Sequence, residues 1–195
     1  MKRLLCITMV FVAALPLAFS QGKAFTVRAF APIDFGGKYM EENSFLGSYG
    51  VDTKMGFGVG GEAMFRVANR VNLGVGLQYL FYRGFDTNKA SDSKFGFMPI
   101  YGLFAFDFNQ RVLDPYMIVR IGYGIFNGND AFTENGHKDL LGGMAFAVGG
   151  GASFNVPSTP LNFFAELDYA SNGGEEASKI TYRRIETCLG LSFTL

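Results

Sequence analysis

The stretch Met55–Val67 reads MGFGVGGEAMFRV, and its side chains alternate between two kinds. Odd positions are mostly apolar, whereas even positions are mostly glycine or charged, as Glu62 and Arg66 are. Successive side chains of a β-strand point to opposite faces, so a period of two predicts a strand and not a helix. This strand would have one apolar face and one face of small and charged residues.

The same alternation recurs in seven other segments of the chain. They are residues 25–34, 71–81, 94–108, 116–126, 144–156, 161–171 and 184–195. Each is close to the ~9–11 residues with which a tilted strand crosses a bilayer. Pro99 lies inside one of them, which is unusual for a central strand because proline lacks the N–H that a ladder needs. The pattern predicts an all-β fold of eight antiparallel strands.

The predicted connections alternate between short and long. The short ones are residues 68–70, 109–115 and 157–160, and the long polar ones are 36–53, 84–93, 127–141 and 172–181. Short turns on one side and long loops on the other are typical of an up-and-down transmembrane β-barrel of the outer membrane. We therefore expect the long loops outside the cell and both chain ends on the periplasmic side.

The polarity of the two faces separates a membrane barrel from a soluble one. Small residues belong inside a narrow barrel, where side chains from all strands compete for space. The glycine-rich face carries the charges, so we place it inside and the apolar face against lipid. Nine charged side chains are expected in the lumen: Arg28, Glu62, Arg66, Asp107, Arg120, Glu166, Asp168, Arg184 and Glu186. Because buried charges need partners, we predict a structural ion-pair network rather than a catalytic or conducting site.

The first residues have the features of a cleaved signal peptide. Lys2 and Arg3 precede an apolar run that ends at Ala18-Phe19-Ser20, where small residues suit a signal peptidase. We expect residues 1–20 to be the signal and residues 21–195 to be the barrel. The alternative is a retained transmembrane helix, but the run is shorter than the ~20 residues that a span needs. Removal of the signal would leave Cys188 as the single cysteine, without a disulfide partner.

Other chemistry is weakly supported. Lys plus Arg and Asp plus Glu both total 17, so a basic surplus for binding nucleic acid is missing. The glycine run from Gly56 to Gly61 alternates within a strand and opens no helix, unlike a nucleotide-binding loop. His137 is the only histidine and lies in a polar connection, so we expect neither a catalytic histidine nor a transition-metal site. Asp130, Glu134 and Asp139 lack an ordered calcium-ligand spacing. No cofactor is expected.

Three further motifs carry a family resemblance. They are Pro99-Ile100-Tyr101-Gly102, the strand from Pro115-Tyr116 to Gly122-Tyr123-Gly124, and the closing residues 190–195, GLSFTL. With the signal peptide, they resemble the small outer-membrane β-barrel family that includes OmpA-, OmpX- and opacity-protein-like barrels. Members usually end in an aromatic residue that the assembly machinery recognises. This chain instead has Leu195 at that place and Phe193 two positions earlier.

The resemblance and the strand pattern together predict a Gram-negative outer-membrane protein without enzymatic activity. Its role would be structural, or it would bind extracellular ligands through the long loops. Expected partners are outer-membrane lipid and the assembly machinery. A narrow porin-like channel is the first alternative, although the interior of eight strands is just wide enough to be filled by side chains. An enzyme that modifies membrane lipid is the second alternative.

Overall fold

The computed structural model describes residues 25–43, 47–86, 92–108, 112–134, 142–175 and 179–195. The predicted signal peptide, residues 1–20, lies outside these residues and stays a prediction. The strands are β1 (Phe25–Asn43), β2 (Gly47–Asp52), β3 (Gly56–Ala68), β4 (Val71–Gly84), β5 (Lys94–Asp107), β6 (Leu113–Gly128), β7 (Gly142–Asn155), β8 (Leu161–Glu175) and β9 (Lys179–Thr194). A short helix, α2 (Asp130–Glu134), follows β6. None of the helices in this part of the chain is long and apolar enough to cross a membrane.

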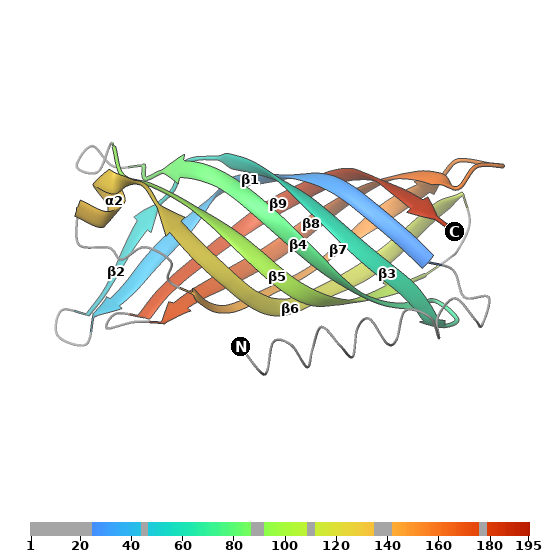
Figure 1. Cartoon of the computed structure of the whole chain (residues 1–195), viewed down its shortest axis with the longest axis horizontal. Helices are drawn as coiled ribbons and strands as arrows, with labels where there is room; N and C mark the ends of the chain where they lie inside the picture. The colour runs from blue at the N-terminus through green and yellow to red at the C-terminus, as the bar shows by residue number, and fades with distance from the viewer. Residues whose placement is uncertain (1–24, 44–46, 87–91, 109–111, 135–141, 176–178) are drawn as a thin grey trace.

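The strands form one closed antiparallel barrel. Each of β3 to β8 pairs with the next strand along the chain, and β1 pairs with both β3 and β9, which closes the sheet. β2 pairs only with residues 38–43 of β1, and β3 pairs with the earlier residues of β1. β2 and β3 therefore occupy one place in the barrel, which confirms the prediction of eight barrel strands. Figure 1 shows the tilted strands, with the start of β1 and the C-terminus at one end and α2 and β2 at the other.

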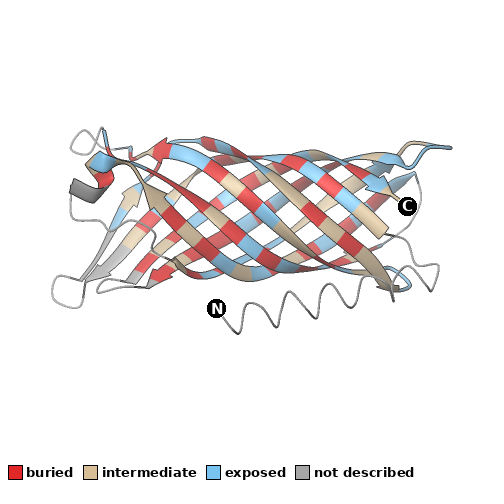
Figure 2. Ribbon diagram, viewed as in Figure 1, coloured by how far each residue is buried: buried red, intermediate tan, exposed pale blue. Residues whose placement is uncertain are grey.

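The alternation in the sequence appears as a checkerboard of buried and exposed residues along the strands (Figure 2). Apolar side chains face outward, as Leu77, Val148 and Leu189 do with 54%, 42% and 48% of their surface exposed. Lipid would cover this band in a membrane, and the closed ladder satisfies the backbone hydrogen bonds that lipid cannot. The inner face holds glycine, alanine and the charged residues, which is the arrangement expected of a narrow membrane barrel.

Two of the long connections predicted from sequence are largely strand. Most of residues 36–53 belongs to β1 and β2, which pair from Lys38–Asp52 to Asn43–Gly47. Most of residues 172–181 belongs to β8 and β9, which pair up to Glu175–Lys179. Polar composition led us to expect loops, but the antiparallel ladder continues through these residues, and their inward side chains Tyr39 and Ile180 are buried. The connections from β4 to β5 and from β6 to β7 are long, as expected.

Two irregularities shift the inward and outward positions. The register of β1 against β9 changes between Asp34 and Gly37, where Gly36 has a φ of 92° that suits glycine. The register of β4 against β5 changes between Leu80 and Arg83. Beyond each shift, positions that the sequence pattern placed outward face inward. Arg83 is at an odd-numbered position, which the pattern placed against lipid, but it points into the lumen and is buried.

Candidate functional site

The centre of the lumen holds an ion-pair network of five side chains from four strands. Arg28 of β1 and Arg120 of β6 bind Glu62 of β3 and Glu166 of β8, and Arg120 also binds Asp168 of β8. The nitrogens of Arg120 lie 2.7, 2.6 and 2.8 Å from Glu62, Glu166 and Asp168 respectively. We call these five residues the central network. Its two cations and three carboxylates leave a formal charge of −1.

Register and aromatic neighbours explain the geometry of the central network. Arg28 and Glu62 are directly opposite each other on β1 and β3, and their side chains share a bond of 3.0 Å. Tyr101 donates to Glu62 at 3.0 Å and Tyr116 donates to Glu166 at 2.7 Å, so both tyrosines occupy lone pairs that the arginines leave free. The carboxylates are thereby held in charge-assisted bonds from several directions.

A second group of charges, which we call the upper network, lies towards the end that carries α2. Arg83 pairs with Asp34, and the Tyr182 hydroxyl donates to the same carboxylate at 2.8 Å. Arg184 pairs with Glu186 at 2.7 Å and lies 3.7 Å from Asp34. Two cations and two carboxylates balance here. All five side chains are buried, so the upper network also closes its section of the lumen.

An aromatic plug lies above the upper network. Its residues are buried and come from β1, β4 to β6, β9, α2 and the segment after β4: Tyr39, Leu80, Phe85, Phe95, Phe97, Phe126, Phe132, Ile180 and Tyr182. Phe132 of α2 is 1% exposed and stacks on Phe85 with ring centroids 6.4 Å apart. The helix α2, at one end of the barrel in Figure 1, therefore contributes a buried ring to the plug.

The opposite end of the barrel, which loop lengths predict to face the periplasm, is more open. Arg66 pairs with Asp107 at 3.3 Å, and 39% of the Arg66 side chain is exposed. Asn72 donates to the same carboxylate at 2.9 Å. These residues line a polar cavity of about 90 Å³. This cavity ends below the central network, because Arg28 and Tyr116 also line it.

The nine lumen charges predicted from sequence all lie on the inner wall. The central network contains five of them, the upper network contains Arg184 and Glu186, and Arg66 pairs with Asp107 at the more open end. Sequence reasoning did not include Asp34 and Arg83. Asp34 was on the inward face of its strand and could have been included. Arg83 could not, because the irregularity before it reverses the alternation.

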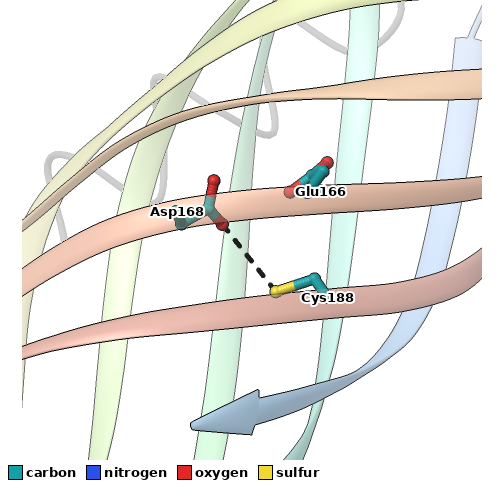
Figure 3. A group of neighbouring side chains, drawn as sticks. All are labelled: Glu166, Asp168 and Cys188. Carbon is teal, nitrogen blue, oxygen red and sulfur yellow. Dashed lines mark hydrogen bonds between the residues drawn. The ribbon is translucent and has the colours of Figure 1, made fainter. Parts of the chain in front are cut away.

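Glu166, Asp168 and Cys188 lie close enough together to suggest a metal site. Figure 3 shows them on neighbouring strands, with the Cys188 thiol donating to the Asp168 carboxylate at 3.8 Å. Their possible ligand atoms lie within 4.8 Å of one another. However, Arg120 donates to both carboxylates, so its guanidinium occupies the position of positive charge that a metal would take. The arrangement fits an arginine site better than a metal site.

The loop residues considered for other chemistry lie mostly outside the described part of the chain. His137 and Asp139 are among the residues that the structure does not describe. Asp130 is the first residue of α2. The expectation of neither a catalytic histidine nor a calcium site therefore stays a prediction.

A closed antiparallel barrel with an apolar outer band and a charged, filled interior defines an outer-membrane β-barrel. The chain belongs to the outer membrane protein β-barrel domain family, whose model matches residues 6–193. The resemblance to small outer-membrane barrels is thereby confirmed, and a Gram-negative outer membrane is the location that this family indicates.

One solved structure shows the same fold, and two others are less similar. Neisserial surface protein A is 22% identical with a TM-score of 0.59, over 87% of this chain and 97% of that one. Ail of Yersinia pestis is 15% identical with a TM-score of 0.47, over 89% and 99%. The barrel domain of Pseudomonas aeruginosa OprF is 14% identical with a TM-score of 0.46, over 88% and 97%. No curated protein sequence matches the chain.

Proposed function

We propose that this chain is a non-conducting, non-enzymatic outer-membrane barrel with a structural or surface-interaction role. The observation that carries the proposal is the closure of the lumen at three successive levels. The central network, the upper network and the aromatic plug each contain side chains from strands on several sides of the barrel. A path for ions would have to break charge-assisted bonds at two levels and separate packed rings at the third.

Conductance in planar bilayers tests the closed lumen. We expect the wild-type protein to give no current steps above those of the bare bilayer. A variant with Glu62, Arg120 and Glu166 changed to alanine, together with Arg83→Ala, Arg184→Ala, Phe95→Ala and Phe97→Ala, removes bulk at all three levels and shows whether the assay can detect an opened barrel. Wild-type conductance whose ion selectivity changes in Arg120→Gln would refute the proposal and support the narrow channel.

The surface role is supported by the two tall hairpins. The β1–β2 and β8–β9 pairs continue their ladders beyond the last exposed apolar side chains of β1 and β9, Phe35 and Ile185. We infer that extracellular ligands bind there and that outer-membrane lipid and the assembly machinery are the other partners. Replacing residues 41–49 by a short turn should abolish binding of cells to an envelope or host surface, while folding persists. If cells that carry the shortened variant still bind, the ligand contacts another part of the protein.

The absence of catalysis is tested separately. Lipid extracted from a deletion strain should match lipid from the complemented strain in acylation and head-group pattern. A lipid species that disappears on deletion and returns on complementation would contradict the proposal and support a membrane-lipid enzyme. Complementation with His137→Ala would then show whether the single histidine is needed for the reaction.

A further inference from the structure

An outward-facing groove of about 300 Å³ lies on the outer wall where β8, β9 and β1 run side by side. Gly36 and Gly37, at the irregularity in β1, line it. A Cβ at Gly37 would lie 2.1 Å from the Arg183 carbonyl oxygen, so β1 and β9 approach closely there. The floor is apolar and includes Met40, Tyr169 and Ile185.

Two cations stand at the rim of this groove. Lys38 and Arg183 are both exposed, line the groove and are Cα partners directly opposite each other on β1 and β9. Like charges placed this way repel. Neither side chain has an ion-pair partner within 4.0 Å in the part of the chain that the structure describes. Asp52 is the Cα partner of Lys38 on its other side, in β2, without forming such a pair.

The rim coincides with the edge of the apolar band. Along β9 the outward side chains Leu191, Leu189 and Ile185 are apolar and exposed, and Arg183 follows them towards the extracellular end. Along β1 the last exposed apolar side chain before Lys38 is Phe35. Basic residues at such an edge extend to the head-group level of the bilayer. The groove therefore spans the boundary between acyl chains and head groups of the outer leaflet.

We propose that this groove binds an anionic outer-leaflet lipid, with the phosphate on Lys38 and Arg183 and an acyl chain along the Met40, Tyr169 and Ile185 floor. An apolar floor beneath a pair of unpaired cations complements an amphiphile that has both an acyl chain and a phosphate. A free phosphate would leave the floor uncovered, and a neutral lipid would leave the two cations without a counter-charge.

The chain contains no tryptophan, which allows a single fluorescent reporter at the groove. Tyr169→Trp places it on the floor, and Tyr123→Trp, outward on β6 and 54% exposed in the parent residue, is the matched control. Each variant is reconstituted in phosphatidylcholine vesicles that contain a minor fraction of lipid with brominated acyl chains, either phosphatidylglycerol or phosphatidylcholine. The ratio of quenching by the two brominated lipids reports the local enrichment of the anionic one.

We expect enrichment at position 169 but not at position 123, by about fivefold for each cation, since a basic residue near an anionic lipid contributes about 1 kcal/mol. Lys38→Gln with Arg183→Gln should reduce the ratio at 169 to that at 123. Heat-modifiable migration in gels checks that every variant is folded. Equal ratios at the two positions in the parent background would overturn the proposal.

Two other occupants would also overturn it. If excess inorganic phosphate abolishes the enrichment at constant ionic strength, the cations bind a free anion and not a lipid. If the reporter at 169 is shielded from both brominated lipids and cross-linking gives a dimer, a second copy of the chain covers the groove.

Discussion

Replacing Arg120 by methionine is the sharpest test of the central network. Arg120 makes three of its five ion pairs, with nitrogen–oxygen distances between 2.6 and 2.8 Å. Without it, Arg28 alone faces Glu62, Glu166 and Asp168, and the formal charge of the group changes from −1 to −2. Breaking a buried ion pair by removing one partner costs about 3–5 kcal/mol, because the remaining charge stays buried. We expect Arg120→Met to lower the free energy of unfolding by about that amount.

The measurement is reversible urea unfolding in lipid vesicles, monitored by the circular dichroism of the tyrosine side chains in the near ultraviolet. Arg66→Met is the matched control, since Arg66 is 39% exposed and makes one pair of 3.3 Å, so its loss should cost no more than about 1 kcal/mol. Adding Glu166→Gln to Arg120→Met removes one of the stranded charges and should recover part of the loss. If Arg120→Met costs no more than Arg66→Met, water screens the lumen charges and the network does not hold the barrel closed.

Leu189→Arg places a charge in the apolar outer band and should cost about 2–4 kcal/mol near the bilayer midplane, measured by the same unfolding assay; a negligible cost would move this face away from lipid. Gly149→Ala adds a Cβ that would lie 1.8 Å from Asp168 Oδ1 and 2.4 Å from the Leu167 carbonyl, so about 1–3 kcal/mol should be lost, and unchanged stability would contradict the packing of β7 on β8. Phe132→Ala removes the ring that caps the aromatic plug and should cost about 3–5 kcal/mol without opening a conducting path, since both charge networks remain. An epitope tag within residues 176–178 should be accessible on intact cells and one after Asn69 should not; the reverse would invert the topology.

Alternation and turn signals were enough to predict the barrel, because each strand has one face in lipid and the other in a crowded lumen. The same rule placed Glu62 and Arg120 on the inner wall without any knowledge of register. It could not say that Arg120 meets three carboxylates, since those come from β3 and β8, far apart in the sequence. The partners depend on the stagger of the closed barrel, which a single strand does not reveal.

The rule failed where the backbone departs from a regular strand. Arg83 is at an odd-numbered position, like the outward residues of β4. It faces inward and pairs with Asp34 only because the register changes between Leu80 and Arg83. Gly36 is one glycine among 26, so its positive φ and the register change beside it have no clear signal in the sequence. The extended β1–β2 and β8–β9 hairpins were not predicted for a different reason. A change from apolar to polar residues indicates where the strands leave the lipid, but strand pairing continues beyond that point.

The sequence separation of the ion pairs bears on how the barrel is assembled. Arg28 lies 138 positions from Glu166 along the chain, and Arg120 lies 58 positions from Glu62. A single hairpin entering the bilayer would carry these charges without most of their partners, at a cost of several kcal/mol per ion. The pair between Arg28 and Glu166 forms only when the barrel closes and brings β1 near β8. Insertion and closure are therefore expected to be one concerted event.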